Sequence, residues 1–236
     1  MAAVSADVKL VGLWASPFVI RARLALEISG VGYEFLEETY GKKSELLLKS
    51  NPVYKKMPVL IHGGKTICES MIIVQYIDEV WTNSTKQSIL PLDPYERALA
   101  RFWAVFIDDK WTPSLFGIVR ARTEEAKREA VEGATAALQI LEEGYTKHYD
   151  GKAFFGGGES VGYVDIALGS SLRWIAVVEE VCNVKLLDEA KTPRLLKWAD
   201  RFWADDAVKA VIPETDKFVE FGSMVKATLE AAEATK

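Results

Sequence analysis

The sequence is poor in the residues that build disulfide frameworks and metal centres. Its 236 residues include 2 cysteines, Cys68 and Cys182, and 2 histidines, His62 and His148, and it has no Cys-x-x-Cys pair. Two isolated cysteines exclude a disulfide framework and a cysteine-based zinc site, and they are typical of a protein kept in a reducing compartment. The two distant histidines leave a metal cluster or a histidine-activated nucleophile without its parts. We therefore expect no bound metal and a cytoplasmic location.

Long apolar runs and phosphate-binding motifs are also missing. No stretch approaches the roughly 20 apolar residues that a membrane-spanning helix needs, and residues 1–7 lack the basic and apolar regions of a secretory signal. Gly64-Lys65-Thr66 resembles the end of a nucleotide-binding loop, but the position where that motif requires its first glycine is Val59. The 34 acidic and 29 basic residues give a net charge of -5, so no global positive field attracts nucleic acid or an anionic membrane. We expect neither partner.

The residues that are present are typical of a soluble globular chain, with 49% hydrophobic and 27% charged residues. The charge is uneven, because residues 1–83 carry 9 basic and 9 acidic side chains and the whole net charge lies beyond them. Residues 82–88 are polar and turn-prone, and Asp93-Pro94 is typical of a helix start with proline at the first helical position. We predict an N-terminal domain over 1–83, a linker over 84–92 and a second domain over 93–236.

The hydrophobic periodicity changes at this linker. Short β-rich segments alternate with helical patterns before it, and every pattern beyond it is helical. His62-Gly63-Gly64-Lys65 carries the two glycines that a two-residue hairpin turn favours. The sequence therefore predicts an α/β domain of order βαβαββα followed by an all-helical domain. The predicted strands are 8–12, 33–37, 59–61 and 66–68, and the predicted helices are 17–29, 44–50, 70–80, 94–119, 124–145, 163–182, 193–203 and 214–232.

Two predicted helices begin with residues that suit both capping and ligand binding. Ser16-Pro17 follows the first strand and fits a serine N-cap with proline at the first helical position. Glu69-Ser70 stands before an apolar run and fits a second serine N-cap. Capping alone explains both pairs, yet a hydroxyl at a helix N-terminus also stabilises an anion there, where N–H groups and the helix dipole converge. A carboxylate at the same place suits a ligand that carries both an ammonium and a carboxylate group.

The segment before the third predicted strand offers two further features. An ordinary trans bond is the default before Pro58, but in a βαβαββα domain a cis bond would turn the backbone of Met57 towards the first helix. An extended peptide could then pair with that backbone. Lysines flank the second predicted helix at 42–43 and 55–56. They fit a solvated face, or a pair that reaches one anionic end of a ligand.

The order of these motifs resembles that of the cytosolic glutathione transferases over nearly the whole chain, and within them it looks most like the plant tau class. The resemblance implies a thioredoxin-like domain that holds glutathione and a helical domain that holds an electrophile, joined in a homodimer. The motifs that carry it are Ser16-Pro17-Phe18, Asn51-Pro52-Val53-Tyr54-Lys55-Lys56-Met57-Pro58-Val59-Leu60, Ile67-Cys68-Glu69-Ser70, Asp93-Pro94-Tyr95, Arg101-Phe102-Trp103 and Gly162-Tyr163-Val164-Asp165-Ile166-Ala167-Leu168.

The activity that this resemblance implies is conjugation of glutathione to hydrophobic electrophiles, as in xenobiotic detoxification, with hydroperoxide reduction as a side activity. Ser16 would donate its hydroxyl hydrogen to the sulfur and favour the thiolate, and glutathione would be a co-substrate with no further cofactor. A non-catalytic carrier of hydrophobic ligands or glutathione conjugates is the alternative. The residues implied to bind the rest of glutathione are Lys43 and Lys56 at the glycine-end carboxylate, Met57 at the cysteinyl part, and Glu69 and Ser70 at the γ-glutamyl end.

The resemblance also implies roles outside the glutathione contacts. Arg21 and Asp108 would extend the polar network around the γ-glutamyl end. Asp165 is expected to be structural, although many family members have Ser or Thr where this chain has Gly162. The residues implied to line the electrophile site are Phe18, Trp111, Phe116, Val119, Trp174 and Phe221.

Ser16, which follows the first predicted strand, and Cys68, at the end of the fourth, bear on the type of reaction. A cysteine in place of Ser16 would support thiol–disulfide exchange, which serine cannot carry out. Cys68 is predicted to be a buried apolar side chain, because burial and the neighbouring Glu69 would both raise its pKa.

Overall fold

The computed structural model describes residues 7–82, 88–149, 151–155 and 158–234. The chain divides into two units, one formed by Met1–Arg97 with Asp206–Ile212 and the other by Ala98–Asp205 with Pro213–Lys236. The predicted linker 84–92 lies partly outside the described residues.

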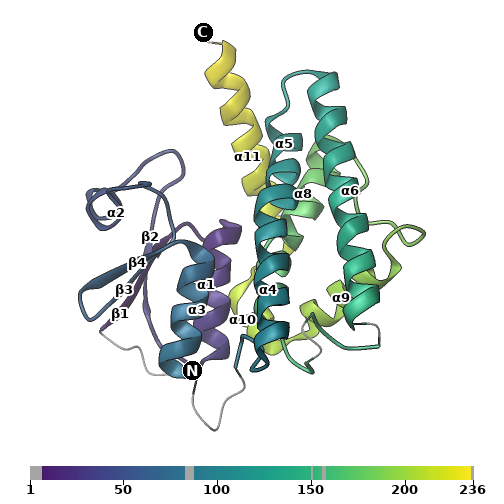
Figure 1. Ribbon diagram of the computed structural model, residues 1–236. Helices are drawn as coiled ribbons and strands as arrows, with labels where there is room; N and C mark the ends of the chain where they lie inside the picture. The colour runs from purple at the N-terminus through teal and green to yellow at the C-terminus, as the bar shows by residue number, and fades with distance from the viewer. Residues whose placement is uncertain (1–6, 83–87, 150, 156–157, 235–236) are drawn as a thin grey trace. The chain divides into compact units, whose positions relative to one another are not determined.

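The first unit is built on a mixed four-stranded sheet with strand order β2-β1-β3-β4 (Figure 1). β1 pairs in parallel with β2 and antiparallel with β3, and β3 pairs antiparallel with β4. The predicted hairpin is confirmed, because His62 pairs with Lys65 and the two glycines between them have positive φ angles of 55° and 76°. The strands are β1 (Val8–Gly12), β2 (Glu34–Glu37), β3 (Val59–His62) and β4 (Lys65–Cys68).

Helices cover both faces of this sheet (Figure 1). α1 (Pro17–Ile28) and α3 (Ser70–Trp81) pack against each other on one face. α2 (Glu45–Ser50) covers the other face, where Leu47 joins Val11 and Val59 in a small buried cluster. The predicted βαβαββα order is confirmed, since every predicted strand and helix of this unit is present within a residue or two of its expected bounds.

The end of β1 lies unusually close to α1, and this closeness depends on Gly12. A Cβ atom at that position would stand 2.6 Å from both methyl carbons of Val19. Only glycine lets the strand and the helix approach this far without displacement of the valine. The turn between them, residues 13–16, is therefore held at one end by β1 and at the other by α1.

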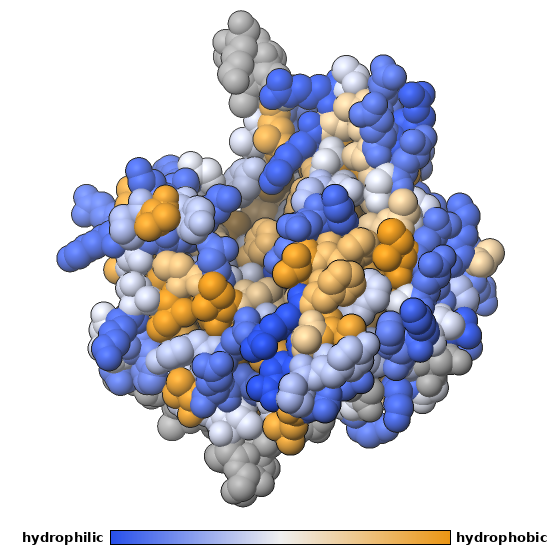
Figure 2. All heavy atoms as spheres, in the orientation of Figure 1, coloured by the Kyte–Doolittle hydropathy of each residue, from blue (hydrophilic) through white to orange (hydrophobic). Residues whose placement is uncertain are grey.

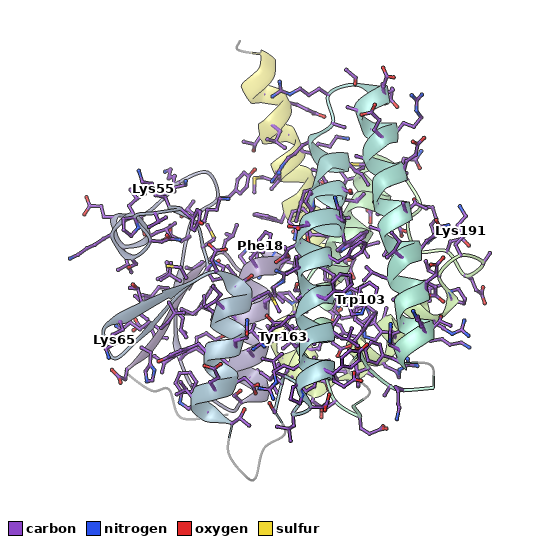
Figure 3. All side chains as sticks on the ribbon, in the orientation of Figure 1. Phe18, Lys55, Lys65, Trp103, Tyr163 and Lys191 are labelled. Atoms are coloured by element: carbon purple, nitrogen blue, oxygen red, sulfur yellow. The ribbon has the colours of Figure 1, made fainter. Side chains whose placement is uncertain are left out.

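All the regular elements described in the second unit are helices. The ring of Trp103 (Figure 3), a residue of α4, packs against α6, where a Cβ atom on Gly144 would stand 2.3 Å from that ring. The predicted N-cap of α4 is confirmed, because Asp93 Oδ1 accepts the N–H groups of Tyr95 and Glu96 at 2.9 and 3.0 Å. The helices are α4 (Pro94–Phe106), which begins in the first unit, α5 (Thr112–Arg120), α6 (Glu124–Tyr149), α7 (Tyr163–Gly169), α8 (Leu172–Cys182), α9 (Pro193–Ala204) and α11 (Thr215–Ala234).

The prediction of one continuous helix over 94–119 is wrong. A π-helical turn, η1 (Ile107–Trp111), separates α4 from α5, and the N–H of Thr112 bonds to the carbonyl of Ile107, five residues back. Pro113 has no N–H to donate in the first turn of α5. A carbonyl one turn earlier therefore loses its α-helical partner, which favours a local change of hydrogen-bond pattern.

The predicted helix over 163–182 is also interrupted. The hydroxyls of Ser170 and Ser171 donate to the carbonyls of Ala167 and Leu168, at 3.1 and 2.7 Å, and so compete for the groups that a continuing helix would use. The prediction missed α10 (Asp206–Val211), a short helix that packs against α1 and completes the first unit. Its six residues are too few to show a periodicity in the sequence.

Candidate active site

Ser16 stands at the N-terminus of α1, with the extended backbone angles of an N-cap (φ -71°, ψ 122°). Its carbonyl accepts the first helical hydrogen bond, from the N–H of Ile20 at 2.9 Å. The predicted N-cap position is thus confirmed, but the side chain makes no capping hydrogen bond. The helix does not use the hydroxyl, which remains suited to a ligand at the positive end of the helix dipole.

Met57 lies against the turn that carries Ser16. The peptide bond between Met57 and Pro58 is cis, which is the alternative that the sequence left open beside the default trans bond. The Met57 sulfur accepts the N–H of Leu13 at 3.1 Å, and the carbonyl of Leu13 accepts the N–H of Ser16 at 3.0 Å. The structure therefore joins two predicted site residues, 41 positions apart in the sequence, through one residue of the turn.

The predicted pair Glu69 and Ser70 stands at the N-terminus of α3. Glu69 occupies the N-cap position with φ 70° and ψ 117°, a region that non-glycine residues rarely adopt and that is often found at functional sites. The expectation that Ser70 caps α3 is wrong, since Ser70 is the first helical residue. Its hydroxyl instead accepts a hydrogen bond from Nη1 of Arg21 at 3.2 Å. This bond joins α3 to α1, where the guanidinium of Arg21 also lies 5.1 Å from the ring centroid of Phe18.

The two predicted lysines, Lys43 and Lys56, are exposed on either side of α2. The second of these loops is shaped by the buried Asn51, a residue that had no predicted role in the site. Its side-chain amide donates to the carbonyl of Lys56 at 2.9 Å, and its Oδ1 accepts the N–H of Tyr54 at 3.1 Å. Asn51 thereby fixes the backbone directly before Met57. An asparagine that directly follows a helix and precedes a proline is the only sequence signal of this role.

Three of the predicted electrophile-site residues form one aromatic cluster in the second unit. The ring centroids of Phe116 and Trp174 lie 5.2 Å apart, and those of Trp174 and Phe221 lie 6.1 Å apart, both in edge-to-face contact. They come from α5, α8 and α11 respectively. The structure therefore gathers side chains that are more than 100 residues apart in the sequence.

The other predicted electrophile residues lie outside this cluster. Trp111 is fully buried, and its indole N–H donates to the hydroxyl of Ser171 at 2.9 Å. Val119 lines a separate cavity of about 150 Å³ together with residues of α11. Phe18 belongs to the first unit, where it lies on α1 (Figure 3). Asp108 lies in η1 of the second unit, so its predicted connection with Arg21 stays a prediction.

Asp165 is structural, as expected. It is fully buried at the N-terminus of α7, where its carboxylate accepts hydrogen bonds from the N–H groups of Gly162 and Phe155 and from the indole of Trp198. Burial raises the pKa of this carboxyl to about 7, and those hydrogen bonds lower it by less. Cys68 is half-buried rather than buried, and burial together with Glu69 raises its pKa in the expected direction.

The described part of the chain shows neither a cluster of metal-ligating residues nor a membrane-spanning helix. No three histidine, cysteine or acidic residues of this part are grouped so that they would hold a metal ion. None of its helices combines the length and the apolar character needed to cross a membrane.

Comparison with known proteins gives consistent matches over most of the chain. Residues 6–79 match the family model for the glutathione S-transferase N-terminal domain, and residues 93–206 match the model for the C-terminal domain. Glutathione S-transferase U18 of Arabidopsis thaliana is 56% identical over 215 residues, which cover 91% of this chain and 94% of that protein. The crystal structure of a tau class glutathione S-transferase from mango superimposes with a TM-score of 0.86 and 59% identity, covering 92% and 98% of the two chains. A rice enzyme solved in complex with glutathione superimposes with a TM-score of 0.83 and 33% identity, covering 94% and 97%.

Proposed function

Because this chain belongs to the tau class of the glutathione S-transferase family, we propose that it transfers the thiolate of glutathione to hydrophobic electrophiles, with Ser16 as the residue that stabilises the thiolate. The family and the thioredoxin-like fold that the sequence resembled are thereby confirmed. The observation that carries the role of Ser16 is that its hydroxyl stands at the start of α1 and makes no capping bond.

The physical task of such a site is to favour the ionised form of the glutathione thiol. A thiol with a pKa of about 8.5 is only a few per cent ionised at pH 7, and the thiolate is the nucleophile. A hydrogen bond from a hydroxyl to a charged acceptor is worth about 1.5–3 kcal/mol, and the N-terminus of α1 adds about 0.3–1 kcal/mol. Since about 1.4 kcal/mol of selective stabilisation lowers a pKa by one unit, these two contributions together lower the thiol pKa by about one to three units. Ser16 requires no general base for this role.

The other residues of the first unit would hold the rest of glutathione. The backbone of Met57 would pair with the cysteinyl part of the peptide, which is supported by the cis peptide bond that follows it and by the contact of its side chain with Leu13. Glu69 and Ser70 would bind the γ-glutamyl end, with Arg21 orienting the Ser70 hydroxyl. The exposed ammonium groups of Lys43 and Lys56 would meet the glycine-end carboxylate.

The electrophile would bind against the second unit. The aromatic cluster of Phe116, Trp174 and Phe221 would supply apolar contacts from its two partly exposed phenylalanines, which pack against the buried Trp174. An apolar wall with few polar groups accepts a wide range of ligands and discriminates little between them. Phe18, Trp111 and Val119 remain proposed members of the same site, and Arg21 and Asp108 remain a proposed polar network. Hydrophobic xenobiotics fit this description, and hydroperoxides are proposed as further substrates.

We propose a homodimer in the cytoplasm as the working form. The second unit exposes large apolar side chains on two of its helices, namely Phe102 and Val105 of α4 and Ile140 of α6. Figure 2 shows hydrophobic residues on the surface where α4 and α6 lie. Such exposed apolar groups are typical of an interface between protein chains. The boundaries 1–83, 84–92 and 93–236 are retained as the proposed functional division of each chain.

The role of Ser16 is tested by steady-state conjugation of glutathione to a chlorodinitrobenzene. We expect Ser16→Ala to lower kcat by about 10- to 100-fold, because the hydroxyl hydrogen bond alone accounts for about one to two pKa units, while the KM for glutathione changes little. Ser16→Thr, which keeps the hydroxyl, is the matched control and should retain most of the activity. Ultraviolet titration of bound glutathione should show a thiol pKa that is higher in Ser16→Ala than in the wild type, whereas Ser16→Thr should not raise it.

Two results would contradict this proposal in different ways. Near-normal turnover by Ser16→Ala would remove the assigned role of the serine but leave the transferase activity. A wild-type protein that binds glutathione conjugates but never conjugates an electrophile would instead be a carrier.

A further inference from the structure

A basic cavity lies within the second unit, at the C-terminal end of α6. It has a volume of about 390 Å³, within the range of small-molecule sites. Its lining includes four cationic side chains, those of Lys152, Arg194, Lys197 and Arg201, together with Tyr145 and Pro193. Such a concentration of positive charge is unexpected in a chain whose net charge is -5.

Three of the four cations form a stripe along one face of α9. Arg194, Lys197 and Arg201 are spaced three and four residues apart, so their side chains share a helix face over two turns, or about 10 Å. Lys152 contributes the fourth charge from the loop that follows α6. Like charges at this spacing repel one another by a few tenths of a kcal/mol per pair, and a bound anion would relieve that repulsion.

The guanidinium of Arg201 is held in place by neutral oxygens. Its Nε donates to the carbonyl of Ala153 at 2.8 Å, and its Nη2 donates to the hydroxyl of Tyr145 at 3.0 Å. The Tyr145 hydroxyl in turn donates to the carbonyl of Lys152 at 2.6 Å. These bonds fix the position of Arg201 without neutralising its charge.

A carboxylate beside this stripe, that of Glu142, already caps a helix. Glu142 of α6 accepts the N–H groups of Arg194 and Leu195 at 3.0 and 2.8 Å, and so caps the N-terminus of α9. Its distance to Nη1 of Arg194 is a longer 3.9 Å. Among the residues that the structure describes, Lys152 and Lys197 form no ion pair. The cavity therefore retains a net positive charge.

We propose that this cavity is a binding site for a small phosphate-bearing anion with two or more negative charges, such as a diphosphate or a sugar phosphate. Two arginines and two lysines match this chemistry, because guanidinium groups bind phosphate oxygens in pairs and ammonium groups add point charges around them. Pro193 and the Tyr145 ring supply an apolar wall for an organic part of the ligand. All of these residues belong to the second unit, whereas the residues proposed for glutathione belong to the first, so the proposal does not depend on the proposed function.

The test is a calorimetric titration of the full chain with inorganic pyrophosphate at low and constant ionic strength. We expect saturable binding of one pyrophosphate per chain, weakened at least tenfold in the double variant Lys152→Gln and Lys197→Gln. The side chains of both lysines are exposed and form no ion pair with any described residue, and the bond to Lys152 uses its backbone carbonyl. The variant should therefore fold, which its conjugating activity and melting temperature would verify. Substitution of Arg201 is avoided because its hydrogen bonds support the loop after α6.

The matched control is the double variant Lys43→Gln and Lys56→Gln, which removes the same two charges from the first unit. It should bind pyrophosphate within twofold of the wild type. Loss of binding in this control instead, or equal binding by wild type and the Lys152 and Lys197 variant, would overturn the proposal. Citrate serves as the competing polycarboxylate, and tighter binding of citrate than of pyrophosphate would overturn the assignment to phosphate.

Discussion

Arg21 and Ser70 are joined by a hydrogen bond of 3.2 Å that runs from the guanidinium Nη1 to the serine hydroxyl. Both side chains are buried, and the bond links α1 to the first residue of α3. The two helices that carry Ser16 and Glu69 at their N-termini are thus connected by polar groups as well as by apolar packing. In the proposed site Arg21 acts as a positioning residue, because it orients a hydroxyl that would itself contact the γ-glutamyl end.

Arg21→Met tests this positioning role. Loss of the bond should leave the Ser70 hydroxyl free to rotate, which weakens glutathione binding, and we expect the KM for glutathione to rise about tenfold, or 1.4 kcal/mol. The chemical step does not involve Arg21, so kcat should change less than threefold. A fall in kcat with an unchanged KM would contradict the assignment.

Arg23→Met is the matched control for this substitution. Arg23 lies two residues further along α1, and its Nε donates to the hydroxyl of Tyr33 at 3.1 Å instead of to Ser70. Its guanidinium also lies 5.2 Å from the ring of Phe35, away from the proposed glutathione contacts. We expect both kinetic constants of Arg23→Met to stay within twofold of the wild type.

The elements of the first unit could be predicted because each is bounded by residues with a local effect on the backbone. Pro17 begins α1, the glycines at 63 and 64 close the hairpin, and the residues around Pro58 mark the start of β3. These effects act within a few residues and are visible in the sequence alone. The positions of Ser16 and Glu69 at helix starts followed from the same local rules.

What the sequence did not show depends on contacts between distant residues. The bond from Trp111 to Ser171 joins positions 60 apart, at the two places where the predicted helices are interrupted. The Leu13 contact with Met57 and the capping of α9 by Glu142 are of the same kind. Side-chain partners of this sort follow from tertiary packing, which periodicity and propensity do not describe.

Asp165 predicts a pH dependence of stability. Burial raises its pKa to about 7 from an ordinary value of 3.8, so the folded chain keeps this proton over a range in which the unfolded chain has lost it. The contribution to stability is therefore complete below pH 3.8 and is lost progressively as the pH rises towards about 7.

Urea unfolding of wild type and Asp165→Asn at several pH values between 5 and 8 measures this contribution. Asparagine does not titrate, so the stability advantage of the wild type over the variant should shrink as the pH rises to about 7 and stay constant above it. An advantage that grows with pH would show that the ionised carboxylate is the stabilised form.

Substitution of Asp78, near the end of α3, is expected to lower the stability of the fold strongly. Its Oδ1 accepts the N–H of Ile89 at 2.7 Å and its Oδ2 accepts the N–H of Leu90 at 3.1 Å, while the hydroxyls of Thr82 and Ser88 donate to the same carboxylate. Asp78→Asn turns one acceptor oxygen into a donor that faces two other donors. We expect the free energy of unfolding to fall by about 2–4 kcal/mol, measured by urea denaturation.

The neighbouring Glu79→Gln removes the same charge from an exposed position and is the control for Asp78→Asn. It should change the free energy of unfolding by less than about 0.5 kcal/mol. Equal effects of the two substitutions would mean that net charge, and not the hydrogen bonds of Asp78, determines the result.

The close contact between Gly12 and Val19 should make the effects of substitutions at these two positions depend on each other, and it should control where Ser16 lies. Gly12→Ala would bring a new Cβ within 2.6 Å of the Val19 methyl carbons, and we expect overpacking to lower the free energy of unfolding by about 1–3 kcal/mol. Because α1 carries Ser16, the displacement should also lower kcat.

Val19→Ala removes the two methyl groups that the new Cβ meets, so the double variant should be more stable than the sum of the single effects predicts, by at least about 1 kcal/mol. Partial recovery of kcat in the double variant would tie the position of the hydroxyl to this contact, whereas additive losses in both measurements would show that the strand and the helix adjust independently.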